Sequence, residues 1–312
     1  MVHAGTRTRR KLEPVAFNPP RALGVIVGGA LGAWALIAAF LAARLAFGAG
    51  AELKTFVAWV VVAVCVLLAL AFLNWTYSIL SLSYIIDRDT LTVRWGFRRV
   101  VIPIDAIQRM VPGRTLDEAQ IDGLNWWGCH VGSADVKRMG YTLFYSTHSS
   151  PEELLYLVTN NEAYALTVLD QAAFAEEIQA RAALGPVEYH AQRSEAVGLA
   201  ALPFWRDHVA LVVAALAGVA CAALGAYVFA NYPDLPQVVE LSFPALGGVV
   251  RVGDKEELLR IVYLGVGILA LNTVAGVSLH AMERAAGLWL LASSGVLQFI
   301  LLGAAVFAFS RA

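Results

Sequence analysis

The sequence predicts a membrane protein in which two blocks of membrane-spanning α-helices flank one soluble domain of mainly β structure. Of its 312 residues, 59% are hydrophobic and only 15% are charged, and the mean hydropathy is +0.64. In soluble domains about a quarter of the residues are charged. The apolar residues are concentrated in windows that approach or exceed the roughly 20 residues an α-helix needs to cross a bilayer. Between these windows, the middle of the chain is ordinary globular sequence.

Five windows with few or no charges predict the membrane helices. The first is longer than the roughly 7 to 15 apolar residues of a cleavable signal peptide, so we expect it to be retained. Cleavage near the small residues Gly48, Ala49 and Gly50 is the alternative. The five expected spans are residues 22–47, 56–80, 208–230, 258–280 and 286–309.

Basic residues predict how these helices are oriented, because cytoplasmic segments next to membrane helices are enriched in Lys and Arg. The turn between the first two helices offers only Arg44 and Lys54. Basic residues crowd both flanks of that helix pair, at Arg7, Arg9, Arg10, Lys11 and Arg21 and again at Arg88, Arg94, Arg98 and Arg99. We therefore expect a cytoplasmic tail (1–21), a two-helix hairpin (22–80), a cytoplasmic domain (81–206), and a three-helix segment (207–312) with an external loop (231–257) and an external C-terminus.

The soluble segment alternates short runs of β-branched and aromatic residues with turn signals, which predicts strands. Apolar side chains recur at every second position around Trp95 and Leu143, so we expect both to be buried on inward strand faces. We expect a tight turn at Asn160-Asn161, because Asn tolerates positive φ. The seven expected strands are Ser83–Asp87, Leu91–Trp95, Phe97–Pro103, Trp126–Val131, Gly140–Ser146, Leu154–Thr159 and Ala163–Val168.

After the last strand the apolar period changes to that of a helix. Asp170 is a suitable N-cap for a helix over Gln171–Leu184. Phe174 and Ile178 mark its apolar face, and Gly185-Pro186 ends it.

The order of these features resembles one known family. A membrane helix ends where the strands begin, and the strands contain Tyr84-Ile85-Ile86-Asp87, Leu91-Thr92-Val93 and the Ile102-Pro103-Ile104 step before Ile107. Together with the closing helix around Phe174, this pattern is similar to the bacterial pleckstrin-homology-like (PH) domains over residues 78–184. The resemblance implies a bent β-sandwich or barrel capped by a C-terminal helix, at a bacterial plasma membrane and without an established enzymatic activity.

A second resemblance covers residues 230–305. Tyr232-Pro233-Asp234-Leu235-Pro236, Phe243, Gly247-Gly248 and an apolar helix pair are similar to a small bacterial membrane family of unknown function. Ser242 stands where that family commonly has His, so any role of such a His is absent here. The prolines and apolar residues of this loop, with a short extended piece at Val249, Val250 and Val252, predict a compact ordered cap. A mobile loop is the alternative.

The usual signatures of catalysis are missing. No HExxH, GxSxG, GxxxxGK[ST] or GxGxxG element occurs in a suitable context. The three cysteines have no paired spacing, and the adjacent Cys129 and His130 would point to opposite faces of a strand. We therefore expect no enzyme, no cofactor and no metal site. The net charge of −1 argues against a nucleic-acid partner. Asn74 and Asn272 are expected to form interhelical hydrogen bonds rather than a transport site.

Two sets of residues are candidate contact sites. The first hairpin carries Arg88, Arg94, Arg98 and Arg99, which would lie near lipid headgroups or a partner. Juxtamembrane arginines are equally expected from orientation alone. Small residues repeat at four-residue spacing in two helices, where they favour close packing within the bundle or against another subunit. These are Gly24, Gly28 and Gly32 in the first and Ala214, Gly218 and Ala222 in the third.

The leading functional hypothesis is a non-enzymatic, membrane-anchored PH-like interaction module, in the form of an accessory subunit of a larger membrane complex. Its partners would be membrane lipid and a protein of unknown identity. The alternative is a membrane protein that binds anionic lipid or a small ligand. A membrane enzyme or transporter would need polar residues that converge inside the helix bundle, and the sequence offers almost none there.

Overall fold

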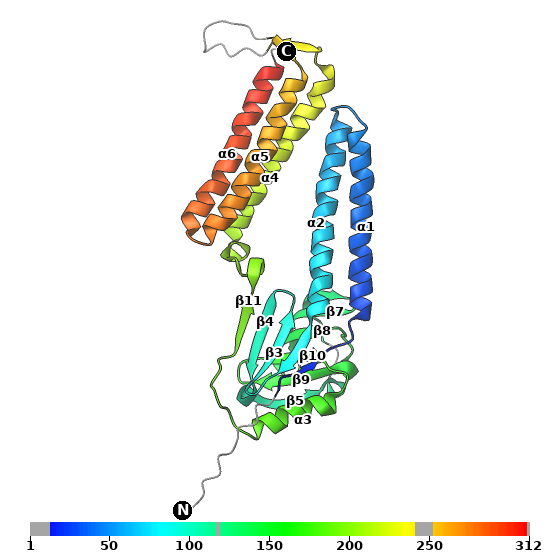
Figure 1. Ribbon diagram of the computed structural model, residues 1–312, viewed down its shortest axis with the longest axis vertical. Coiled ribbons are helices and arrows are strands. Elements are labelled where there is room, and N and C mark those ends of the chain that lie inside the picture. Colours follow the sequence, from blue (N-terminus) through cyan, green and yellow to red (C-terminus); the bar gives the residue numbers. More distant parts are fainter. Residues whose placement is uncertain (1–12, 117–118, 241–251, 311–312) are drawn as a thin grey trace, which may run out of the picture. The chain divides into compact units, whose positions relative to one another are not determined.

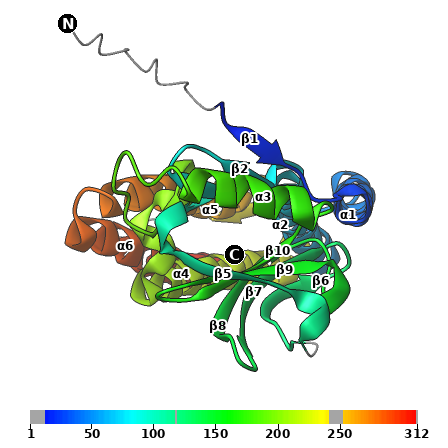
Figure 2. The same cartoon turned by 90° about the horizontal axis from the view of Figure 1, so that it is seen from below.

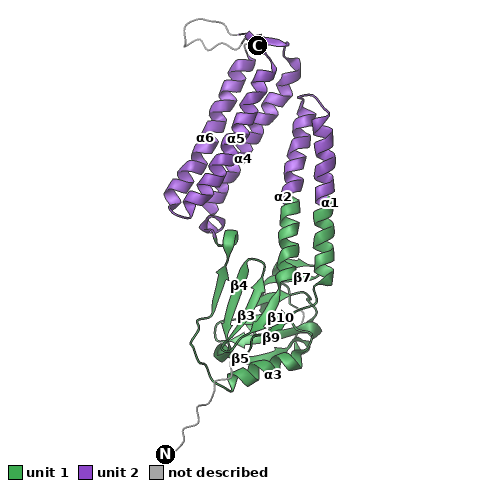
Figure 3. Cartoon of the chain, in the orientation of Figure 1, with its two compact units in different colours: residues 1–34, 68–201 green, residues 35–67, 202–312 purple. Residues whose placement is uncertain are grey.

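The computed structural model describes residues 13–116, 119–240 and 252–310. The chain forms two compact units, which Figure 3 distinguishes by colour. Unit 1 comprises residues 1–34 and 68–201, and unit 2 comprises residues 35–67 and 202–312. Helices α1 (Ala22–Phe47) and α2 (Leu53–Ser81) run through both units, because the boundary falls inside each helix.

Unit 1 contains two β-sheets that share one core. The five-stranded sheet has the order β1-β2-β3-β4-β11, with every neighbouring pair antiparallel. Its strands are β1 (Val15–Phe17), β2 (Ser83–Ile86), β3 (Thr90–Trp95), β4 (Arg98–Pro103) and β11 (Arg193–Ala196).

The six-stranded sheet has the order β5-β9-β10-β8-β7-β6, and its β8–β10 pair is parallel. Its strands are β5 (Ile107–Pro112), β6 (Asp122–Trp126), β7 (Cys129–Val136), β8 (Gly140–Ser146), β9 (Leu154–Thr159) and β10 (Ala163–Thr167). Single-turn 3-10 helices occur at Ile104–Ala106, Gly113–Thr115, Pro151–Glu153, Gly198–Ala201, Pro203–Arg206 and Tyr232–Asp234.

Helix α3 (Gln171–Ala182) closes this core at the end of the domain that faces away from the unit 1 parts of α1 and α2 (Figures 1 and 2). Phe174 and Ile178 insert from α3 between the sheets, beside Tyr84 and Leu157. Burial of each such side chain contributes roughly 1.5 to 3 kcal/mol. Asp170 caps the helix as expected, since its carboxylate accepts a hydrogen bond from the Ala173 amide at 2.9 Å.

Unit 1 has eleven strands in its described residues, where the sequence predicted seven. The run from 126 to 131 is not one strand: β6 ends at Trp126, the chain turns through Trp127 and Gly128, and β7 begins at Cys129. Gly128 has a φ of +75°, a conformation that favours glycine. Strand β1 also lies in the segment assigned to the cytoplasmic tail, where it pairs with β2.

The expected turn at Asn160-Asn161 connects β9 and β10, but neither residue has a positive φ. Thr159 Oγ1 instead accepts hydrogen bonds from the amides of Asn161 and Glu162, at 3.4 and 3.3 Å. Trp95 and Leu143 pack against the core from inward strand faces as expected, but both are only partly buried. Leu116, Ala119 and Ile121 pack on the other face of the six-stranded sheet, where Phe144 is 1% exposed.

Unit 2 contains α4 (His208–Asn231), α5 (Glu256–His280) and α6 (Arg284–Phe309), packed around Leu224, Val228, Val262 and Ala305. With α1 and α2, these are five helices long and apolar enough to cross a membrane by length and composition. Strands β12 (Val238–Glu240) and β13 (Val252–Asp254) pair in the predicted loop. Residues 241–251, which include Phe243 and Gly247-Gly248, lie outside the described residues, so the ordered cap stays a prediction.

Helix α2 passes almost directly into the domain, since only Leu82 separates it from β2. The Arg21 guanidinium donates hydrogen bonds to the carbonyl oxygens of Leu80, at 2.7 Å, and Leu82, at 2.6 Å. Ser81 Oγ accepts a hydrogen bond from the Gly96 amide at 2.7 Å. These bonds satisfy backbone groups at the C-terminal end of the helix and tie it to the β3–β4 turn.

Candidate functional site

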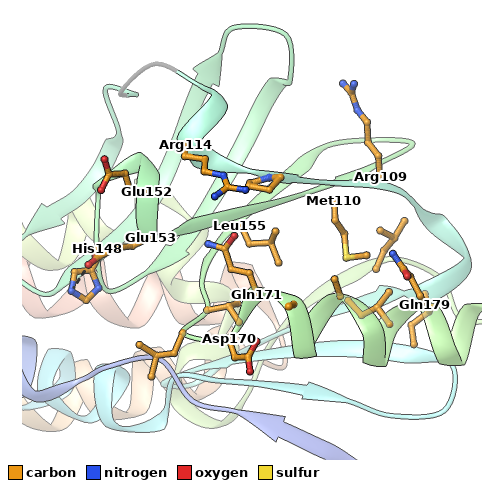
Figure 4. A pocket seen from close by; sticks show the side chains of 18 of the residues that line it. Arg109, Met110, Arg114, His148, Glu152, Glu153, Leu155, Asp170, Gln171 and Gln179 are labelled. Atoms are coloured by element: carbon orange, nitrogen blue, oxygen red, sulfur yellow. Dashed lines mark ion pairs between the residues drawn. The ribbon is translucent and has the colours of Figure 1, made fainter.

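A hollow of about 1060 Å³ lies between strand β5 and helix α3 in unit 1 (Figure 4). One wall is the run from Ile107 to Met110 with Pro112, and the other is a face of α3. His148, Glu152 and Glu153 lie at one end of the hollow. We call this hollow the β5–α3 groove.

Strand β5 is an edge strand, with β9 as its neighbour in the sheet. Among the described residues, no other strand pairs with its outer edge. A strand edge of this kind presents unpaired N–H and C=O groups that another extended segment can use. The sheet is also irregular here, because the register of β5 on β9 shifts between Ile107 and Arg109.

The α3 wall is lined by short side chains. Ala172, Ala175 and Ala182 face the groove at helical spacing, flanked by the amides of Gln171 and Gln179. The sequence folds this way because Phe174 and Ile178 fix the neighbouring stripe of α3 in the core, with Ile178 also lining the groove. Alanine at these positions leaves room beside the strand edge for the side chains of a bound segment.

The two ends of the groove differ in charge. Figure 4 shows Arg109 at one end and His148, Glu152 and Glu153 at the other, with Arg114 between them. His148 Nε2 lies 3.4 Å from the Glu153 carboxylate. Arg109 Nη2 donates a hydrogen bond to the Arg138 carbonyl at 3.2 Å. The groove is therefore polarised along its length.

The four arginines of the first hairpin do not form one cluster. Arg88 lies in the β2–β3 turn, where its guanidinium donates to the carbonyl oxygens of Arg181, Leu184 and Gly185 at 3.4, 3.4 and 2.9 Å. These bonds satisfy carbonyls at and just after the C-terminal end of α3. Arg88 is thus engaged within the domain, at the end of the strands away from α2.

Arg94 and Arg99 are exposed cross-strand neighbours on β3 and β4, and Arg98 lies opposite Trp95. In the described part of the chain, no hydrogen bond or ion pair engages the side chains of these three arginines. Like charges directly opposite each other on a sheet are destabilising. Glu195 of β11 lies opposite Arg99 on its other side, and a bound anion would further relieve the Arg94–Arg99 repulsion.

The small-residue series differ in their surroundings. A Cβ on Gly24 would lie 2.5 Å from the Gly128 oxygen, and one on Gly28 would lie 2.5 Å from Thr76 Oγ1. A Cβ on Gly32 would meet Leu73 at an ordinary 3.7 Å. In α4, Ala222 is exposed and a Cβ on Gly218 would meet open space. The packed face of α4 within the chain instead carries Ala217, Cys221, Leu224, Gly225 and Val228.

The described residues contain no group of three or more His, Cys, Asp or Glu side chains placed to hold a metal ion. His130 Nδ1 lies 2.6 Å from Asn125 Oδ1, and burial lowers the pKa of His130. In the same described residues, neither Asn74 nor Asn272 makes a side-chain hydrogen bond, so the expected interhelical bonds are not formed there.

Sequence reasoning missed the groove because it missed β5. That strand follows the 3-10 turn after Pro103, starts with a bulge and ends at Pro112, so alternation of its side chains is broken. The one signal for this strand in the sequence was its apolar residues Ile107, Met110 and Val111. In the structure, Ile107 and Met110 pack on the main core.

Comparison with known families and structures agrees with this architecture. Residues 82–182 match the family model of the bacterial PH domain. This match covers strands β2 to β10 and ends with α3. No curated protein and no solved structure matches the chain. The match supports a PH-like domain in unit 1, joined to helices that are long and apolar enough to span a membrane.

Proposed function

We propose that this protein is a non-enzymatic, membrane-anchored interaction module whose PH-like domain binds a protein partner, as an accessory subunit of a larger membrane complex. The five apolar helices support anchoring in a plasma membrane. The basic residues on both flanks of the α1–α2 hairpin support a cytoplasmic N-terminus and domain, with the C-terminus outside.

The β5–α3 groove is the observation that carries this proposal. A partner segment in extended conformation would add a strand to the free edge of β5 through main-chain hydrogen bonds. Its alternate side chains would lie over Ala172 and Ala175 of α3. Such β-augmentation obtains affinity from the backbone and specificity from the side-chain positions.

The charges along the groove define the partner segment further. Glu152 and Glu153 favour a basic residue at their end of the segment, and Arg109 favours an acidic residue at the other. We expect an extended stretch of a few residues with opposite charges at its two ends and small or apolar residues between them.

The experiment uses the full-length protein with a photo-activated cross-linking amino acid at Gln108, an exposed residue of the groove. The control places it at Glu176, an exposed position of α3 outside the groove. Cross-linked material is digested, and the attached segment is identified by mass spectrometry. We expect one recurrent segment attached at Gln108 and absent at Glu176.

A matched pair of substitutions tests the same groove. Ala172→Trp fills it, whereas Ala180→Trp adds the same ring at an exposed position of α3 that does not line it. The Gln108 cross-link should disappear with Ala172→Trp and persist with Ala180→Trp. If Ala172→Trp leaves the cross-linked segment unchanged, partner binding in the groove is refuted.

Binding of anionic lipid is the second candidate function, and the exposed Arg94–Arg99 pair favours it. Each arginine near an anionic surface would contribute about 1 kcal/mol. Mass spectrometry of lipids retained by the purified protein tests it. Loss of anionic lipid in Arg94→Gln/Arg99→Gln, but not in Arg114→Gln, would support this function; unchanged retention would exclude it.

A further inference from the structure

The turn that joins β6 and β7 is wedged against both helices at the base of the α1–α2 hairpin. Gly128 lies so close to Gly24 that neither position has room for a Cβ. The Trp126 ring packs at a tilt of 44° against the Trp75 ring of α2, with ring centroids 5.3 Å apart. Ile79 of α2 and Cys129 of β7 share a small buried cluster there. The tip of this hairpin therefore lies beside the first turn of α1 and the last two turns of α2.

This tip exposes two neighbouring tryptophans. Trp127 is 69% exposed and Trp126 is 42% exposed. A second exposed aromatic pair occurs at the same level of α2, where the Tyr77 ring lies 5.1 Å from the ring of Phe97 in the β3–β4 turn. Tryptophan and tyrosine concentrate where hydrocarbon meets the polar headgroups. Water is a poor environment for so many indole and phenyl rings together.

A shallow hollow of about 450 Å³ accompanies the tryptophans, lined by Asn125, Trp126, Trp127, His130 and Ser149. Asn125, Trp126, Trp127 and Ser149 carry no formal charge. Burial lowers the pKa of His130, which favours its neutral form. Aromatic faces beside an amide and a hydroxyl suit the amphipathic headgroup region of a bilayer and do not select a net negative charge.

The geometry points to a membrane-docking surface on the PH-like domain, in which the β6–β7 tip inserts Trp126 and Trp127 into the interfacial layer of the bilayer. This inference rests on the proposal that α1 and α2 cross the membrane. The docking surface contacts the phospholipid interface, because the β6–β7 tip is continuous with the ends of α1 and α2. Insertion depends on the indole rings, so it is independent of anionic lipid.

Nitroxide accessibility in the full-length protein, reconstituted in vesicles, tests the inference. A spin label replaces Trp127 in a Cys65→Ala background, since Cys129 and Cys221 are buried. Reference labels replace Trp34, at the middle of α1, and Tyr189, an 86% exposed residue of the domain. The ratio of collisions with oxygen to collisions with a water-soluble nickel chelate reports the depth of each label.

We expect a ratio at residue 127 severalfold above that at residue 189 and below that at residue 34, both in purely zwitterionic vesicles and in vesicles with anionic lipid. A ratio at 127 equal to that at 189 overturns the docking surface, even with a deep label at 34. If the label at 34 itself reads as aqueous, membrane anchoring fails instead. Should Trp127→Cys not fold, Ser149→Cys in the same hollow gives the same comparison.

Discussion

Replacement of Tyr84 by Phe tests the contact that joins the two sheets of the PH-like domain. The Tyr84 side chain is fully buried, and its hydroxyl donates a hydrogen bond to the Tyr145 carbonyl at 2.7 Å. The same oxygen accepts a hydrogen bond from the Thr167 amide at 3.2 Å. Tyr84→Phe removes both bonds without changing the ring, and leaves a buried N–H group without its partner. We expect a loss of about 1 to 3 kcal/mol in the free energy of unfolding.

Hydrogen–deuterium exchange on the full-length protein measures this loss. A destabilisation of about 1 to 3 kcal/mol should accelerate exchange of the slowest amides in β8 and β10 by about 5- to 150-fold. Tyr141→Phe is the matched control, because Tyr141 is 57% exposed and its removal should change the free energy by no more than about 0.5 kcal/mol. If Tyr84→Phe exchanged as slowly as the parent, the hydroxyl would not join the sheets as described.

Four further outcomes are expected. Burial raises the pKa of Tyr156 to about 12, so the folded state keeps its proton longer than the unfolded chain, whose tyrosine pKa is about 10. Stability should therefore fall as pH rises from about 10 towards 12, and thermal melts of Tyr156→Phe should show a shallower fall. Gly28→Val should lower the melting temperature of unit 1 and Gly29→Val should not, because a Cβ on Gly29 meets nothing within 4 Å. A cysteine placed at residue 240 should be labelled from outside intact cells, whereas one at residue 150 should be reached only from the cytoplasmic side. External labelling at residue 150 would reverse the predicted orientation. Proteolysis from outside should spare residues 236–250, and rapid cleavage there would rule out an ordered cap.

The long apolar helices and several of the strands could be predicted because their signals are local. The first helix was predicted over 22–47, and the structure has Ala22–Phe47. The strand at 140–146 and the helix that starts after Asp170 also match. In each case a run of apolar residues or a capping side chain determines the element within its own sequence window.

The groove and the helix–domain junction depend on contacts that no window contains. Strand β1 is three residues long and is specified by its pairing with β2, some 70 positions away. The roles of the arginines were equally hidden. Arg21 reaches across to the last carbonyls of α2, and Arg88 reaches those of α3, although both had been counted as basic flanks of a membrane segment. Charge patterning predicts which side of a membrane a segment prefers, but not which carbonyl a guanidinium binds.

Both proposed surfaces lie on the PH-like domain, and its junction with the helices constrains how they are presented. The hydrogen bonds of Arg21 and Ser81 and the close approach of Gly24 to Gly128 hold the base of α1 and α2 against the strand turns. The α3 wall of the β5–α3 groove lies at the far end of the same unit (Figure 1), and His148 at one end of the groove is followed directly by Ser149 of the tryptophan hollow. A domain held at the bilayer by two helix ends and a tryptophan-bearing hairpin loses most of its freedom to rotate. Its groove would then be presented to the aqueous side in one orientation, which lowers the entropic cost for a partner that is itself at the membrane.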